Sequence, residues 1–451
     1  MATRRWKGKA KDVLQVDTIT IALAWTAGDT ITVTCDGIDF VVTIGSLVTT
    51  AQVATTLQEA FSGASEFTDT TASCSPTLAQ GGAQAIPQFR EAVATVSGSV
   101  VTLTGVLATV NGISGSRPFT YTCAENTAST GTATLANDTV ATGKWFFGNA
   151  DNWSGDTVPV DTDTIIFDSG NIDCKYGLSP AIQPTIFRKT KQYSGRIGLA
   201  EINTDDTSYP YNEYRTKDLT FDDNGGATCT YHFEEGEGTG SQLVRINAGA
   251  GLSIFNFYGY GSRLLSGQPS VLLLGTNAAN QINMPQGDGA LGFFSGDAST
   301  AVAARCGNGN PGGATLVLGD TVTLTSSTID ISGGNVTINS ATATADIDVH
   351  SGGTLTILGA VAHASIDVQH GTCNYKSTGT ITTLAVRSAG TFDRSGDLRP
   401  ATITNAVQLF KGAKILDPNK SLTLTAGYVL NGCTHADVTV NLGTDRTYTV
   451  A

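Results

Sequence analysis

The chain has 451 residues, of which 40% are hydrophobic and only 14% are charged, and glycine alone accounts for 52. This content is too apolar and too weakly charged for a disordered chain, so we expect two to four folded domains. The net charge of −13 argues against nucleic acid as a partner, and no segment approaches the roughly 20 apolar residues of a membrane span, so we expect no membrane partner.

The chain opens with a basic arm, residues 1–12, in which five positive residues precede the first acidic one. The rest of the chain then holds 21 basic residues against 39 acidic ones, a net of −18. A short basic arm on an acidic body suggests docking to an acidic surface, and we expect the solenoid core to make no use of these residues. The alternative is a frayed, solvated terminus. The five candidate docking residues are Arg4, Arg5, Lys7, Lys9 and Lys11. No apolar signal-peptide core follows them, which predicts synthesis and assembly in a cytoplasm.

The sequence predicts a small α+β docking module over residues 13–125. Strand-length segments at 18–23, 30–35 and 38–44 include a hairpin turn at Asp36-Gly37, because both residues tolerate positive φ. An amphipathic helix then begins at Thr49 or Thr50 and ends at Gly63, and strands return over 93–96, 99–103 and 119–123. The Thr- and Ala-rich residues 126–143 read as a linker.

The remainder predicts an extended parallel β-solenoid with coils of roughly 19 residues. Residues 144–180, rich in aromatic side chains beside Asn/Gly turns, predict a solenoid cap or connector, and residues 181–315 predict an irregular solenoid with loops. In residues 316–451 the glycines at 333, 352, 371 and 390 open successive coils, and strand-like segments recur in phase at 328–331, 346–349, 365–368 and 383–386. The predicted fold class is therefore mainly β, with an N-terminal α+β module followed by the solenoid.

We predict no catalytic, cofactor-binding or metal-binding residues, and hence no enzyme. Asp346 and Asp348, with Asp367 one coil later, are expected to form an acidic ladder at about 5 Å spacing, within the roughly 5–9.5 Å that glycoside hydrolysis permits. The alternation of Asp346 and Asp348 with inward apolar residues instead places them on the solvent face. Eight widely spaced cysteines lack the close pairs of zinc or redox sites. Two further groups read as solvated positions: the acidic residues Asp222, Asp223, Glu234, Glu235 and Glu237, and the histidines His350, His363 and His370.

Aromatic side chains in two loop regions are candidates either for a subunit interface or for stacking on a glycan. We favour the interface, because β-fibres commonly trimerise along their length, and so expect a homotrimer. The residues are Tyr211, Tyr214, Phe257, Tyr258 and Tyr260.

The order of several motifs resembles one protein family. The motifs are Arg4-Arg5-Trp6-Lys7-Gly8, Asn152-Trp153-Ser154-Gly155, Tyr176-Gly177-Leu178, Gly195-Arg196-Ile197-Gly198-Leu199, Glu213-Tyr214-Arg215, Leu272-Leu273-Leu274-Gly275-Thr276 and the terminal Gly-Gly-Thr-Leu repeats. Together they are similar to virion-associated β-helical proteins of tailed bacteriophages and prophages, over nearly the whole chain.

The resemblance implies a structural component of a virion, such as a capsid decoration, head fibre or tail appendage. Its partners are then other capsid or tail proteins, and it transfers no catalytic residue to this chain. The alternative is a tail fibre or tailspike that binds a host-surface glycan or depolymerises it.

Overall fold

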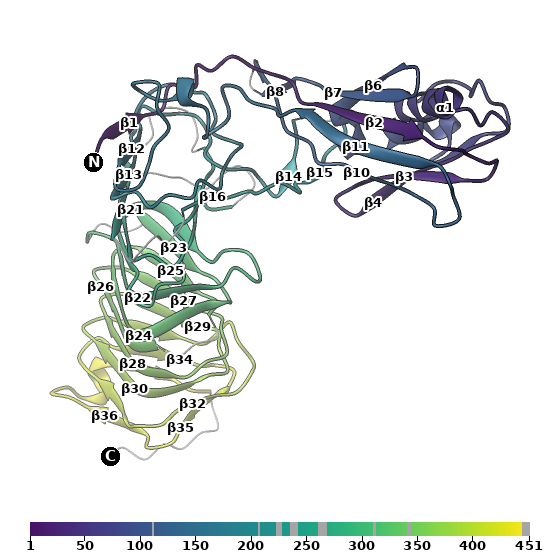
Figure 1. Ribbon diagram of the computed structural model, residues 1–451. Helices are drawn as coiled ribbons and strands as arrows, with labels where there is room; N and C mark the ends of the chain where they lie inside the picture. The colour runs from purple at the N-terminus through teal and green to yellow at the C-terminus, as the bar shows by residue number, and fades with distance from the viewer. Residues whose placement is uncertain are drawn as a thin grey trace.

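The protein consists of a long β-solenoid and a smaller α+β module that projects sideways from the N-terminal end of the solenoid, giving an L shape (Figure 1). The computed structural model describes residues 1–110, 112–205, 208–221, 228–234, 242–259, 268–309, 313–340 and 344–443. Strands make up 45% of the chain, and the parallel solenoid has about 11 turns between residues 164 and 441. The predicted fold class is confirmed.

One parallel sheet, here called the first face, runs the whole length of the solenoid. Its strands are β1 (Thr3–Arg5), β12 (Thr164–Phe167), β13 (Ile186–Lys189), β17 (Cys229–Glu234), β19 (Ser253–Tyr258), the start of β21 (Gln281–Leu291), β22 (Ser299–Cys306), β24 (Val322–Ser332), β26 (Thr344–His350), β28 (His363–Gln369), β30 (Thr380–Arg387), β32 (Ala401–Ile403), β33 (Val407–Leu409), β35 (Leu422–Leu424) and β36 (Tyr428–Leu430).

A second parallel stack, the second face, alternates with the first along the chain. Its strands are β16 (Leu219–Thr220), β18 (Val244–Asn247), β20 (Val271–Leu274), the end of β21, β23 (Ala314–Leu318), β25 (Asn335–Ile338), β27 (Thr354–Ile357), β29 (Thr372–Tyr375), β31 (Thr391–Asp393), β34 (Lys414–Leu416) and β37 (Thr439–Asn441). From β25 to β37, paired residues on successive strands lie 19, 18, 19, 23 and 25 residues apart. The predicted coil length therefore holds for the regular coils, and the last two coils are longer.

In-register stacking of apolar side chains forms the solenoid core. On the first face Ile329 pairs with Ile347 and Ile347 with Ile366, and all three are fully buried. On the second face Leu355 pairs with Cys373 in the same way. Each such side chain contributes about 1.5–3 kcal/mol by leaving water, and each needs the coil above and below to do so.

The chain's first residues complete this core, which corrects the prediction of a basic arm that the core does not use. Strand β1 pairs in parallel with β12, matching Thr3 to Thr164. Trp6 is 2% exposed and packs edge-on against Trp153, with ring centroids 5.2 Å apart. Residues 144–180 supply more rings to this end of the core, including the buried Trp145. A run of basic residues resembles a solvated segment, and the three-residue strand Thr3–Arg5 is too short to show a strand pattern of its own.

The α+β module has its own apolar core. Its elements are β2 (Val16–Ala22), β3 (Thr30–Cys35), β4 (Ile38–Thr43), α1 (Thr50–Ser62), β5 (Ser73–Ser75), β6 (Ala92–Ser97), β7 (Val100–Gly105), β10 (Thr122–Glu125) and β11 (Thr132–Thr139). The predicted helix is confirmed: Thr49 caps it through a reciprocal capping box with Gln52, and Gly63 ends it at φ 64°. The predicted turn at Asp36-Gly37 also has positive φ at both residues.

The predicted linker, residues 126–143, is wrong over the eight residues of strand β11. Strand β11 lies inside it and pairs antiparallel with β2, so the module extends to Thr139. A single antiparallel bridge then joins Val13 to Thr142, which places the two ends of the module side by side. The module is thus an insertion between the first strand of the solenoid and its second.

Candidate functional site

The module and the solenoid meet at a region that we call the junction. Two short hairpins lie beside it, β8 (Ala108–Val110) with β9 (Ile113–Gly115) from the module and β14 (Ile202–Asn203) with β15 (Tyr211–Asn212) from the solenoid. The second hairpin reaches toward the module (Figure 1). A short 3₁₀ helix of the module, Pro87–Glu91, lies just before β6 and carries Glu91 to the same place.

Glu91 is the centre of the junction. Its side chain is fully buried, and the Nη2 of Arg215 contacts both of its carboxylate oxygens. The hydroxyl groups of Tyr211 and Tyr214 each donate a hydrogen bond to it, the latter at 2.7 Å, and Arg117 adds a cation at 3.6 Å. Residues more than 100 positions apart therefore converge on one carboxylate.

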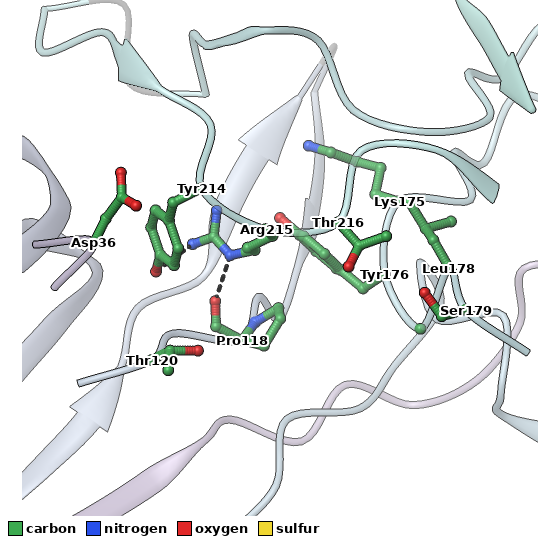
Figure 2. Close-up of a pocket in the computed structure, with 11 residues that line it drawn as sticks. Asp36, Pro118, Thr120, Lys175, Tyr176, Leu178, Ser179, Tyr214, Arg215 and Thr216 are labelled. Carbon is green, nitrogen blue, oxygen red and sulfur yellow. Dashed lines mark hydrogen bonds between the residues drawn. The ribbon is translucent and has the colours of Figure 1, made fainter. Parts of the chain in front are cut away.

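Arg215 in turn has almost all of its donors engaged. Its Nε donates to the carbonyl of Pro118 at 2.8 Å (Figure 2). Its Nη1 donates to Glu213 at 2.8 Å. The guanidinium group lies 4.4 Å from the ring centroid of Tyr214 and 5.7 Å from that of Tyr176, within range of a cation–π attraction. Burial is the largest influence and opposes the charge on Arg215, but Glu91 and the neighbouring tyrosines together outweigh it and raise the pKa of Arg215 above its ordinary value.

Burial also raises the pKa of Tyr214 well above its ordinary range, so its hydroxyl remains a donor to Glu91. A buried carboxylate with two cations and two hydroxyl donors is satisfied as long as every partner is present. Removing one partner leaves charges uncompensated around a carboxylate that is fully buried. The junction therefore has the properties of a lock, meaning a set of contacts that fixes the module in one orientation on the solenoid.

More ion pairs extend the junction into the solenoid. Lys175, with a side chain 2% exposed, donates to both oxygens of Asp205 at 2.8 and 3.0 Å. Arg196 bonds Asp173 through its Nε at 2.9 Å. Burial lowers the pKa of Lys175, with Asp205 opposing that shift.

A cleft of about 590 Å³ opens beside the junction (Figure 2). It is lined by Asp36, Pro118 and Thr120 of the module and by Lys175, Tyr176, Gly177, Leu178, Ser179, Tyr214, Arg215 and Thr216 of the solenoid. Its two cations, Lys175 and Arg215, are already paired with carboxylates within the chain. The cleft therefore presents no unpaired cation for an anionic ligand.

Three of the five predicted docking residues make ion pairs within the chain. Arg4 contacts Asp163 at 3.3 Å, Arg5 pairs with Asp168, and Lys7 contacts Asp156 at 3.2 Å. The other two, Lys9 and Lys11, are exposed. The charges on the first three thus serve at least to hold β1 on the solenoid, and a docking role remains a prediction.

The five predicted aromatic residues fall in different environments. Tyr211 and Tyr214 belong to the junction, where the ring of Tyr214 also lines the cleft, and Phe257 is fully buried in the solenoid core. Tyr258 is 52% exposed and stacks on His232. Tyr260 lies outside the described residues.

Two of the three predicted aspartates, Asp348 and Asp367, form a ladder on the outer side of the first face, whereas Asp346 pairs with Ser365 instead. Asp330, Asp348 and Asp367 are in register on successive strands. The outer two are paired, Asp330 with His350 at 2.6 Å and Asp367 with Arg387 at 2.6 Å. Burial raises the pKa of Asp348, and the neighbouring Asp367, Asp330 and Asp346 raise it further.

The predicted solvent positions of the histidines hold for two of three. His350 and His370 are on the surface, whereas His363 is fully buried with its ring edge-on to Tyr375 at 6.0 Å. The prediction for His363 is wrong because this residue begins strand β28 facing inward. Burial lowers its pKa to about 4.

Of the predicted acidic patch only Glu234 lies within the described residues, and it pairs with Arg188. In the ranges that the structure describes, no group of three or more His, Cys, Asp or Glu side chains is arranged to hold a metal ion. None of the helices in those ranges is long and apolar enough to cross a membrane.

Sequence reasoning missed Glu91 and Arg117 entirely. The available signal was weak: Glu91 is a lone acid between Phe89 and the apolar strand β6. Comparison with protein-family models, with curated proteins and with solved structures found no match to this chain.

Proposed function

We propose that the protein is a structural component of a tailed-phage virion, in which the solenoid is a stiff body and the module is the part that attaches to the particle. Capsid decoration or head fibre is the favoured form. The observation that carries the proposal is the junction: a fully buried carboxylate and its four partners hold the module at one position on a rod of about 11 turns. A fixed angle between the module and the solenoid is useful to a protein whose solenoid must project from the particle, or cover its surface, in a defined direction.

The proposal includes no catalytic step. Stacked coils bury their backbone hydrogen bonds and apolar side chains in one continuous core, which resists unfolding without any active centre. We further propose that the chain assembles as a homotrimer in association with other virion proteins. Light scattering of the purified chain is then expected to give three times 46.6 kDa, and a monomeric mass at micromolar concentration would remove the trimer from the proposal.

Immunogold electron microscopy tests the particle role. Antibody raised against the purified chain should label particles banded in a density gradient from the strain that carries the gene, at a repeated site on each particle. Antibody first absorbed with the purified chain is the control and should leave the particles unlabelled. The proposal fails if the chain is found only in gradient fractions that lack the capsid protein.

A second candidate is a tail fibre that binds a host-surface glycan. The observation that favours it is Tyr258, an aromatic ring that the solenoid core does not use and that remains half exposed.

A further inference from the structure

A groove of about 630 Å³ crosses the outer side of the first face near its N-terminal end. It spans four neighbouring strands, β12, β13, β17 and β19, through side chains that alternate with those of the core. Its lining includes Ile166, Ile186, Arg188, His232, Glu234 and Tyr258. The groove lies on the opposite side of these strands from the buried Phe187, Phe233 and Phe257, so folding alone does not explain its aromatic and apolar content.

Tyr258 forms a platform at one end of the groove. Its ring stacks on His232 with centroids 5.8 Å apart and an angle of only 11° between the planes. Burial and the nearby Arg188 lower the pKa of His232, so the imidazole is neutral at pH 7 and packs as a flat ring. With one face supported and 52% of its surface exposed, Tyr258 is held ready for a flat apolar partner.

Planar polar groups stand beside this platform. Glu234 is in register with Tyr258, and Arg188 bonds Glu234 through its Nε at 2.7 Å. The side chain of Arg188 is 48% exposed and that of Glu234 is 25% exposed, so Arg188 keeps donor sites and Glu234 keeps acceptor sites open to a ligand. Ile166 and Ile186 supply an apolar floor.

This combination selects among ligand classes. An extended peptide has no backbone to pair with here, because β13 and β17 already pair on both sides. Nucleic acid needs clustered cations, whereas this groove is lined by two, Arg188 and Lys191, and Arg188 is neutralised by Glu234. A sugar ring has an apolar face of C–H groups and a rim of hydroxyl groups, which matches an aromatic platform with planar polar groups at its edge.

We propose that this groove binds a saccharide, with a pyranose ring on Tyr258 and its hydroxyl groups on Arg188 and Glu234. The proposal concerns binding only, and it holds whether or not the chain belongs to a virion. Its failure is therefore distinguishable from failure of the immunogold experiment.

A printed array of bacterial capsular polysaccharides and O-polysaccharides, probed with the fluorescently labelled full chain, is the first test. The polysaccharide with the strongest signal is then titrated calorimetrically against wild type and variants. Tyr258→Ala should weaken binding at least about tenfold, whereas Tyr258→Phe, which keeps the ring, should stay within about threefold of wild type. Arg188→Gln should also weaken binding.

Tyr209→Ala is the matched control, because Tyr209 is 40% exposed but lies against Arg90 at the junction. It should bind as wild type does. The proposal is overturned if wild type binds no polysaccharide on the array, if Tyr258→Ala binds normally, or if Tyr209→Ala loses binding equally. It is also overturned if Tyr258→Ala dissociates an oligomer while leaving binding intact, since the groove would then be a contact between copies of the chain.

Discussion

The regular coils of the solenoid and the junction are both buried, but they are stabilised in opposite ways. In the coils, Ile329, Ile347 and Ile366 repeat one apolar contact along the rod, and each side chain has an equivalent neighbour above and below. At the junction, Glu91 occurs once and depends on Arg215 and its other partners together. Damage to the coils should therefore be graded and local, whereas damage to the junction should be cooperative.

The largest effect is expected from Glu91→Gln. The change keeps the shape of the side chain but leaves Arg117 and Arg215 buried without their carboxylate, which typically costs about 3–5 kcal/mol. We expect the module to detach while the solenoid stays folded, seen as a larger radius of gyration in small-angle X-ray scattering and as new protease cleavage near residues 205–216. Asp156→Asn, which removes the exposed partner of Lys7, is the control and should change stability by about 0–1 kcal/mol. Wild-type scattering from Glu91→Gln would show that the junction is not a lock.

Ile347→Ala should cost slightly less, about 3 kcal/mol, through a cavity between two coils. The reason is that Ile347 is fully buried between Ile329 and Ile366. Hydrogen exchange should accelerate in β24, β26 and β28 and remain unchanged in the module. Faster exchange throughout the module would contradict the local character that we assign to the coils.

Acid should weaken the coils through His363. Its folded pKa, about 4, lies below the unfolded value of about 6.5, so between these pH values the unfolded chain binds the extra proton. Stability should therefore fall as pH falls through this window, by about 1–3 kcal/mol in total. His363→Gln should flatten that part of the curve of unfolding midpoint against pH, and His370→Gln, at an exposed position, should leave it unchanged. Equal curves for wild type and His363→Gln would refute the assignment.

The smallest effect is expected at the aspartate ladder. The pKa of Asp348 is raised in the fold by burial and by its acidic neighbours, so its ionised form opposes folding at pH 7. Asp348→Asn should raise the free energy of unfolding at pH 7 by a few tenths of a kcal/mol, about 0.3–1, with the gain shrinking toward pH 4. Asp367→Asn breaks the pair with Arg387 and should not stabilise. A loss of stability in Asp348→Asn would mean that the carboxylate has a favourable partner in the fold.

The same contrast explains how far the sequence could be interpreted. The coils and helix α1 were predictable because each depends on a local pattern: glycines and apolar residues at a fixed period, or Thr49 and Gly63 at the helix ends. Glu91 and Arg215 are 124 residues apart, and β1 and β12 are about 160 apart, with no repeat that links them. Only Trp6, an aromatic residue among basic ones, hinted that the first residues are buried.

The residues misread as a linker show a limit of another kind. Strand β11 buries little besides Ala133 and exposes most of its other side chains, so its Thr- and Ala-rich composition suits an edge strand and a connector equally well. Hydrogen bonds to β2, which composition does not encode, decide between the two. Phe257 and Tyr258 likewise differ by one position, and strand alternation sends the first inward and the second outward.

The bridge between Val13 and Thr142 has a consequence for how such a chain can diversify. The two chain segments that enter and leave the module are adjacent at this bridge. Any compact domain with neighbouring termini therefore fits between them without altering the path of the first coil. The solenoid can then stay constant while the module is exchanged for another domain, in evolution or by engineering. The contacts around Glu91, and the packing of Ala108, Val110 and Ile113 against the solenoid core, would have to be redesigned for each new inserted domain.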